Sequence, residues 1–275
     1  MEKIQQALAK ARAERQDGRQ TRPVVAPIIA EPPAADRSVE DAWAALPEFQ
    51  ADPDQLAQAR VMTLRGGHDA TAFDVMRTKV LQTMRANNWR RLAITSPTPA
   101  CGKSTVSLNL GFSLARQPDV RSIVAELDLR RPSLAKTLKL APAKNFAEVL
   151  QDKADFTQNA VRFGQNLALA VNSGIARNPS EVLQSARVPA ILADIEARFA
   201  PDLMIFDLPP MFASDDTMAF VGQVDCVLLI AGAEATTVKE IDTCERELAS
   251  QTNVMGVVLN KCHFMGKDYG YSYYG

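Results

Sequence analysis

Residues 96–105 of the chain read Ser96-Pro-Thr-Pro-Ala-Cys-Gly-Lys-Ser-Thr105, and this stretch decides the fold. It follows a short apolar run at 92–95 and precedes a helical pattern over 106–116. Its last four residues match the end of a phosphate-binding loop, in which backbone N–H groups at a helix start surround phosphate oxygens. In such a loop Lys103 reaches the β- and γ-phosphates, and the Ser104 hydroxyl meets Mg²⁺. The stretch therefore predicts a nucleotide site between a strand and a helix.

Further apolar runs alternate with helix-like segments along the chain. The alternation predicts an α/β fold, a parallel β-sheet flanked by helices on both faces. Together with the loop at 96–105, whose usual first glycine position holds Pro97, it predicts a P-loop NTPase of the deviant Walker type. A helix from about residue 69 to 87 is expected because Phe73, Met76, Val80 and Met84 form one apolar face. Ligands of such sheets bind beyond the carboxyl ends of the strands. The expected strands are 92–95, 123–126, 167–171, 203–206, 226–231 and 254–259.

Acidic residues follow two of these strands. Glu126 and Asp128 end the second strand, and residues two apart in an extended chain point the same way, so both are predicted to face one phosphate site. Asp207 ends the fourth strand, where an acidic residue holds Mg²⁺ directly or through water. Asp215 and Asp216 lie on the next loop. They are further acidic residues near the phosphate site, and the alternative is that they cap a helix.

The composition excludes several classes of protein. Lys plus Arg number 31 against 32 Asp plus Glu, so bulk charge gives no reason to expect nucleic acid binding. The chain has only two histidines and no CxxC pair, which argues against a zinc site and for a reduced, cytoplasmic protein. No apolar run approaches the roughly 18 residues that suggest a membrane span.

Four segments are expected. Residues 1–16 read as an amphipathic, mildly basic helix, and residues 17–60 hold six of the chain's 16 prolines and read as a flexible linker. Residues 61–262 would form the P-loop domain, and residues 263–275 a tyrosine-rich C-terminal tail. All four tyrosines of the chain lie in that tail, namely Tyr269, Tyr271, Tyr273 and Tyr274. A chain that keeps tyrosine out of its core presents it either as a phosphate acceptor or as part of a sticky terminus.

Several motifs in this order resemble those of the bacterial tyrosine kinases (BY-kinases) that accompany capsule and exopolysaccharide synthesis. The matching motifs are SPTPACGKST (Walker A), ELDLRRP (the second acidic motif), PDLMIFDLPP (Walker B), NPSE at 178–181, GVVLNK at 256–261 and the tyrosine cluster. They extend from about residue 70 to the end of the chain. The helix at 1–16 and the proline-rich segment also resemble the leader of the stand-alone form of these kinases.

The resemblance implies a role for each matching residue. Lys103, Ser104 and Thr105 would bind the phosphates and Mg²⁺, with Ala100, Cys101 and Gly102 completing the loop. Asp128 and Asp207 would organise Mg²⁺, and Glu126 stands where the family has the Asp proposed to accept the tyrosine proton. Asn260 would contact the base, and Arg130 would contact phosphate or support the second acidic motif.

The sequence departs from the family pattern at a few positions. Pro97 replaces the usual first glycine of the loop, and Ala100 replaces a glycine near its end. Glu126 is one methylene longer than Asp. In the helix that assembles the family's ring, Thr71 and Asp74 replace the expected Glu and Arg, and only Arg77 is retained. The sequence therefore does not decide whether the family's ring interface forms or how efficiently the chain catalyses phosphate transfer.

The resemblance implies an ATP- and Mg²⁺-dependent tyrosine autokinase that phosphorylates its own tail, neighbour to neighbour, in a homo-oligomer. It also implies control of polysaccharide synthesis and export, a separate membrane co-polymerase as activator, a cognate tyrosine phosphatase and a place at the inner face of the membrane. One alternative is a ParA/MinD-like ATPase, which needs a lysine where Thr98 stands. The other is a non-catalytic nucleotide-binding regulator, which the changes at Ala100 and Glu126 would suit.

Overall fold

The computed structural model describes residues 34–262, with side chains from residue 38. The chain divides into two compact units, Met1–Asp36 and Arg37–Gly275, and the sheet and its helices belong to the second. The predicted helix at 1–16 and the tyrosine tail at 263–275 lie outside the described residues. Within residues 34–262, no helix is long and apolar enough to cross a membrane.

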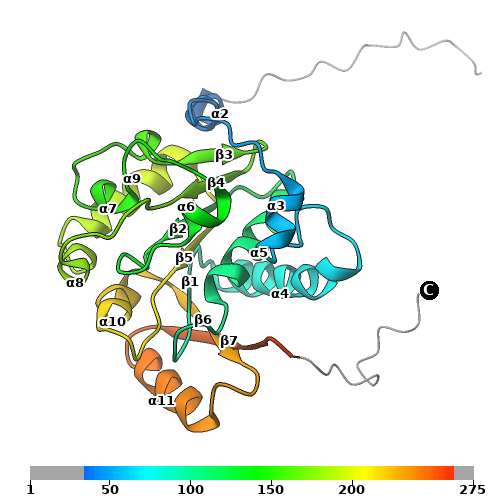
Figure 1. Ribbon diagram of the computed structural model, residues 1–275. Helices are drawn as coiled ribbons and strands as arrows, with labels where there is room; N and C mark the ends of the chain where they lie inside the picture. Colours follow the sequence, from blue (N-terminus) through cyan, green and yellow to red (C-terminus); the bar gives the residue numbers. More distant parts are fainter. Residues whose placement is uncertain (1–33, 263–275) are drawn as a thin grey trace, which may run out of the picture. The chain divides into compact units, whose positions relative to one another are not determined.

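A seven-stranded sheet forms the centre of the second unit (Figure 1). Its order is β3-β4-β2-β5-β1-β6-β7, and every neighbouring pair is parallel except β3 with β4. The predicted parallel sheet is thus confirmed, with each predicted strand found within a residue or two. The additional strand is β3, a three-residue edge strand too short to show a period. The strands are β1 (Arg91–Thr95), β2 (Ser122–Glu126), β3 (Val161–Phe163), β4 (Leu167–Ala170), β5 (Leu203–Asp207), β6 (Cys226–Gly232) and β7 (Asn253–Asn260).

Helices cover both faces of the sheet, as Figure 1 shows, because alternate residues of the buried strands point to opposite sides. One core joins the strands to α3 (Pro53–Gln58), α4 (Thr71–Asn87), α5 (Lys103–Ala115) and α6 (Leu134–Leu138). The other contains residues of α2 (Ala34–Ala44), α7 (Phe146–Val149), α8 (Pro179–Leu183), α9 (Val188–Phe199), α10 (Asp216–Phe220) and α11 (Val238–Ala249). Single 3₁₀ turns lie at η1 (His68–Ala70), η2 (Phe156–Gln158) and η3 (Val221–Gln223).

The predicted linker at 17–60 is wrong for the part that the structure describes. Helices α2 and α3 lie in it, and Trp43, Leu46 and Leu56 are at most 3% exposed. The Trp43 indole N–H donates to the carbonyl of Phe199 at 2.7 Å, and the two rings meet edge to face. Prolines misled the prediction because Pro53 starts α3, a position at which proline favours a helix. The folded domain therefore begins well before residue 61.

The strand order brings three distant segments to one edge of the sheet. Strand β5 lies between β1 and β2, and all three run in the same direction. Their carboxyl ends therefore place residues 96–105, 127–131 and 207–210 next to one another. Backbone bonds hold the chain around the first and third of these together, from Leu208 N–H to Ile94 O in β1 at 2.9 Å and from Met211 N–H to Ser96 O at 2.8 Å.

Candidate functional site

The loop between β1 and α5 depends on a glycine at position 102. Gly102 has φ +93°, in the left-handed region that favours glycine, and it caps the N-terminus of α5. A Cβ at this position would lie 2.3 Å from Nδ2 of Asn260. That Asn260 nitrogen donates to the carbonyl of Cys101 at 2.9 Å, so the end of β7 supports the loop from outside. The loop backbone is thereby fixed with its amides at the start of a helix, the arrangement that binds phosphate.

Ala100 in the same loop adopts φ +64°, a left-handed conformation that costs a side-chain-bearing residue about 1 kcal/mol. We expect Ala100→Gly to raise the free energy of unfolding by about that amount, because glycine takes this conformation without steric cost. Urea denaturation of the two proteins measures the difference. Gly102→Ala is the matched opposite change and should destabilise. Equal stability of wild type and Ala100→Gly would show that the loop relaxes around Ala100.

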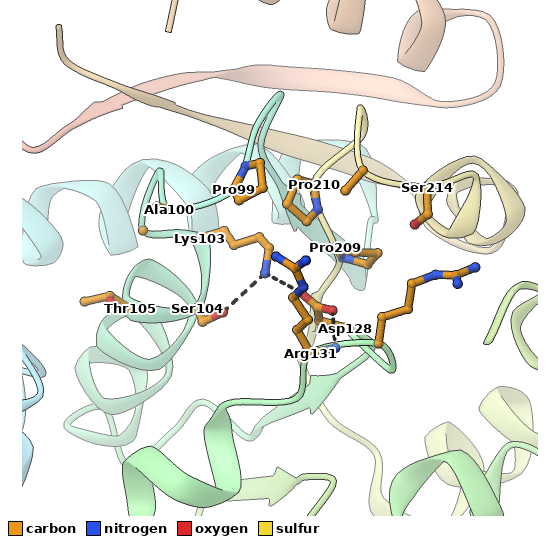
Figure 2. A pocket seen from close by; sticks show the side chains of 13 residues that line it. Pro99, Ala100, Lys103, Ser104, Thr105, Asp128, Arg131, Pro209, Pro210 and Ser214 are labelled. Atoms are coloured by element: carbon orange, nitrogen blue, oxygen red, sulfur yellow. Dashed lines mark hydrogen bonds and ion pairs between the residues drawn. The ribbon is translucent and has the colours of Figure 1, made fainter. Parts of the chain in front are cut away.

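Lys103 and Asp128 form an ion pair at the centre of the site. Lys103 Nζ lies 2.9 Å from Asp128 Oδ2 and 3.5 Å from the Ser104 hydroxyl, as the dashed lines in Figure 2 show. The other oxygen of Asp128 accepts the backbone N–H of Arg131 at 3.0 Å. Burial alone would lower the pKa of Lys103, but the charges of Asp207 and Asp128 outweigh it and raise that pKa. The lysine is thus a fixed cation at the loop.

Asp207 ends β5 and is completely buried. Its Oδ1 accepts the Ser107 hydroxyl at 3.2 Å, whereas its Oδ2 has no hydrogen-bond partner among residues 34–262. Burial raises the pKa of Asp207, and the positive charge of Lys103 opposes that rise only in part. A buried carboxylate oxygen without a partner is costly, and a cation would satisfy it. Asp207 therefore fits the predicted Mg²⁺ role.

The residues present fit Mg²⁺ shared with a nucleotide rather than a closed metal site. No group of three or more His, Cys, Asp or Glu able to hold a metal occurs among the described residues. Mg²⁺ is usually held by one or two carboxylates together with substrate phosphates and water. Asp207, Asp128 and the Ser104 hydroxyl could supply that protein share, and the bound ion would neutralise phosphate charge.

Lys103, Ser104 and Asp128 line a cavity of about 370 Å³ at the strand ends (Figure 2), whereas the fully buried Asp207 does not line it. Ligand pockets are commonly of this size or larger. Of the predicted phosphate and metal ligands, Ala100, Gly102, Lys103, Ser104, Thr105, Asp128 and Arg130 line it. Cys101 is buried behind the loop and contacts Thr98 and Thr236, and Asn260 supports the loop from outside. Lining residues that the sequence did not single out are Pro99, Arg131, Pro209, Pro210, Ala213 and Ser214.

The predicted orientation of Glu126 is wrong. Strand β2 ends at Glu126, so the two-residue period does not continue to Asp128, and the two carboxylates diverge. Oε1 of Glu126 accepts backbone N–H groups of Ser133 at 2.5 Å and Leu134 at 2.8 Å, and Oε2 accepts that of Asn172 at 2.9 Å. Glu126 is fully buried and does not line the cavity. It holds two loops together, and Asp128 is the carboxylate that faces the site.

The buried carboxyl of Glu126 should make stability depend on pH. Burial raises its pKa from an ordinary 4.5 to about 7, although three backbone N–H bonds oppose the shift. Its protonated form is then favoured by folding, so its stabilising contribution is complete below pH 4.5 and disappears as pH rises through 7. The shift corresponds to about 3 kcal/mol. Urea unfolding of wild type and Glu126→Gln should show the wild type losing stability relative to the variant as pH rises through this range. A constant difference would contradict this.

Arg130 is held at the rim by an acidic partner. Its Nε lies 2.6 Å from Oδ2 of Asp216, and its Nη2 donates to the Ser180 hydroxyl at 3.1 Å. Asp216 is fully buried and is a structural partner of Arg130; it is the first residue of α10, whose N-cap Asp215 makes no side-chain capping hydrogen bond within the described part of the chain. Burial raises the pKa of Asp216, but the hydrogen bonds from Arg130 and Ser180 outweigh this effect and hold that pKa below its ordinary value. Arg130 thus ties the loop after β2 to the NPSE segment and to α10.

The altered helix α4 uses its charges within the chain. Asp74 accepts hydrogen bonds from the Ser113 hydroxyl at 2.6 Å and from Arg116 Nη2 at 2.8 Å. Arg77 lies 3.2 Å from Asp74 and donates to the Ser113 carbonyl at 3.0 Å. The Thr71 hydroxyl donates to the carbonyl of Gly67, at 3.4 Å. These contacts join α4 to α5, so Asp74 and Arg77 stabilise the domain itself.

Comparison with known proteins finds several tyrosine-protein kinases among the similar sequences and structures. No protein-family model matches the chain. Tyrosine-protein kinase ptk of Acinetobacter johnsonii is 30% identical over 188 residues, 67% of this chain and 25% of that protein. Tyrosine-protein kinase YwqD of Bacillus subtilis is 26% identical over 205 residues, 74% of this chain and 85% of that protein. The kinase domain of the Escherichia coli tyrosine kinase ETK superposes with a TM-score of 0.64 at 28% identity, covering 74% of this chain and 80% of that one.

The extent of these matches differs between relatives. The chain spans about a quarter of the length of the Acinetobacter relative and most of the Bacillus relative. The cell-division ATPase MinD of Pyrococcus furiosus is also similar, with a TM-score of 0.53 at 19% identity over 62% of this chain and 71% of that one, a likeness of fold alone. The P-loop fold is therefore shared with other ATPases, while the relatives with higher sequence identity given above are tyrosine-protein kinases.

Proposed function

The chain belongs to the bacterial tyrosine-kinase family, and from that premise we propose that it phosphorylates tyrosines of its own C-terminal tail with ATP. The observation that carries the proposal is the ion pair of Lys103 and Asp128 at one cavity, with the charge of the buried Asp207 acting on Lys103, in a chain whose tyrosines all lie at 269–274. The fifteen residues 261–275 could span roughly 50 Å, which allows a tail to enter its own site or that of a neighbour.

The reaction would be an in-line transfer of the γ-phosphoryl group. A bond forms between the tyrosine oxygen and the γ-phosphorus, the bond from that phosphorus to the β-bridging oxygen breaks, and ADP leaves. The phenol proton must be accepted, because a phenol with a pKa near 10 is mostly protonated at neutral pH. Asp128 is the carboxylate that lines the cavity, so we assign it this role in place of Glu126. Lys103 and the loop amides would stabilise charge on the transferring group.

Magnesium would be bound between Asp207, Asp128, Ser104 and the nucleotide phosphates. The chemistry it supplies is neutralisation of phosphate charge during the transfer. The protein's contribution is to hold these three side chains at adjacent strand ends, where the buried Asp207 oxygen lacks a protein partner among residues 34–262.

The wider role is part of the same proposal. By its motifs the chain would regulate exopolysaccharide or capsule synthesis and export. It would act with a separate membrane co-polymerase at the inner face of the membrane, as a homo-oligomer whose tail a cognate phosphatase resets. Each phosphate adds about −1.5 to −2 charges, so a fully modified tail would repel its neighbours and loosen the assembly.

Incubation of the purified chain with Mg²⁺ and ATP, followed by detection of phosphotyrosine, tests the proposal. We expect signal from wild type and none from Lys103→Met, which lacks the cation at the loop. Signal that persists in Lys103→Met would contradict the site. Tight ATP binding without phosphotyrosine, even with a membrane partner's cytoplasmic segment added, would instead favour the non-catalytic regulator.

A further inference from the structure

Two adjacent arginines follow Asp128, and the structure gives them different surroundings. Arg130 is engaged by Asp216 and Ser180 at the rim. Arg131 has no ion-pair partner among residues 34–262, and its side chain points into the cavity toward the end of Lys103 (Figure 2). The guanidinium that is available to a ligand is therefore that of Arg131.

We propose that Arg131 contacts the terminal phosphate of bound ATP and so distinguishes ATP from ADP. The inference rests on the proposed function in taking ATP as the nucleotide. A guanidinium presents several N–H donors in a planar fork that matches phosphate oxygens, and it remains charged at any working pH. Arg131 directs such a guanidinium into the cavity beside the phosphate-binding loop, where none of residues 34–262 accepts a hydrogen bond from it.

The position of Lys103 indicates which phosphate lies near Arg131. In a loop of this kind the lysine reaches the β- and γ-phosphate oxygens. Lys103 extends from the loop across the cavity to Asp128, on the wall that carries Arg131. Phosphates bound along the loop would therefore present their terminal group, rather than the inner ones, to that wall.

Local structure fixes Arg131 in this place. Its backbone N–H donates to Asp128 Oδ1 at 3.0 Å, while the other oxygen of Asp128 binds Lys103. Pro132 follows directly, and a residue before proline is restricted to extended conformations. A ligand that binds Asp128 would thus also affect the hydrogen bond that holds the backbone of Arg131.

Equilibrium binding of ADP and of an ATP analogue with a non-hydrolysable β–γ bridge, with Mg²⁺ present, tests the inference without requiring kinase activity. We expect Arg131→Ala to weaken binding of the analogue on the order of tenfold or more, the usual loss for a hydrogen bond to a charged group, with ADP binding unchanged. Arg131→Lys should lose less, because it keeps the charge but not the fork. Arg85→Ala, an exposed arginine on α4, is the matched control and should bind both nucleotides as wild type does.

Three results would overturn the inference. If Arg131→Ala weakened the binding of ADP and of the analogue equally, Arg131 would contact the inner phosphates instead. Unchanged binding of both would leave it facing solvent. A wild-type chain that binds neither nucleotide would overturn the proposed function as well, which separates that failure from the other two.

Discussion

Replacement of Asp207 by asparagine is expected to reduce phosphotyrosine formation by at least about 10²-fold, the scale on which single charge-stabilising groups contribute to catalysis. The change keeps the size of the side chain and an oxygen that can accept the Ser107 hydroxyl. It removes the negative charge whose second oxygen has no partner in the described part of the chain. Initial rates of tail phosphorylation at saturating Mg²⁺ and ATP measure the effect.

The stability of the same variant separates a catalytic role from a structural one. Because burial raises the pKa of Asp207, the ionised carboxylate costs free energy in the fold, and the neutral amide removes that cost. We therefore expect the nucleotide-free variant to unfold at no lower temperature than wild type. Asp202→Asn, at the exposed residue just before the same strand, is the matched control and should keep full activity. A variant that loses activity and stability together would contradict the assignment.

Replacement of Trp43 by alanine is expected to lower the free energy of unfolding by about 3–5 kcal/mol, the usual cost of removing a buried tryptophan. The side chain is 3% exposed and packs edge to face on Phe199, with the ring centroids 6.0 Å apart. Its indole N–H also donates to the carbonyl of Phe199. The variant loses both the packing and the hydrogen bond, and it leaves a buried carbonyl without this donor. For a domain of this size the thermal midpoint should fall by on the order of 10 °C.

Trp89 offers the matched control, because it is the other tryptophan and is only partly buried. Its replacement by alanine should cost clearly less than that of Trp43. Trp43→Phe should show an intermediate loss, since the ring contact is kept and the hydrogen bond is not. If residues 38–60 were a linker, all Trp43 variants would unfold at the wild-type midpoint.

The sequence predicted the sheet well because its strands are buried on both faces. A strand such as 203–207 is continuously apolar until its final aspartate, and burial of that kind leaves a strong signal. The loop at 96–105 was readable for a similar local reason, because glycine, lysine and serine must sit at a helix start to bind phosphate. Both predictions depend on neighbours in the chain.

The predictions that were wrong depended on distant neighbours. Glu126 was placed at the site by the two-residue period of an extended strand, but the strand ends there and its partners are the amides of Ser133, Leu134 and Asn172. Trp43 was assigned to a linker because prolines surround it, although Phe199 lies 156 residues away in sequence. The sequence does not distinguish Arg130 from Arg131. Both line the cavity in the fold, but Asp216 pairs with Arg130, and Arg131 has no ion-pair partner among residues 34–262.

Phosphorylation of the tail by the site at Lys103, Asp128 and Asp207 can be observed directly. Tandem mass spectrometry of the full chain after incubation with Mg²⁺ and ATP makes the observation, with Lys103→Met as the matched control. We expect phosphate on one or more of Tyr269, Tyr271, Tyr273 and Tyr274 in wild type, and on none of them in the variant. A wild-type chain that binds ATP and leaves all four tyrosines unmodified would contradict the proposed function.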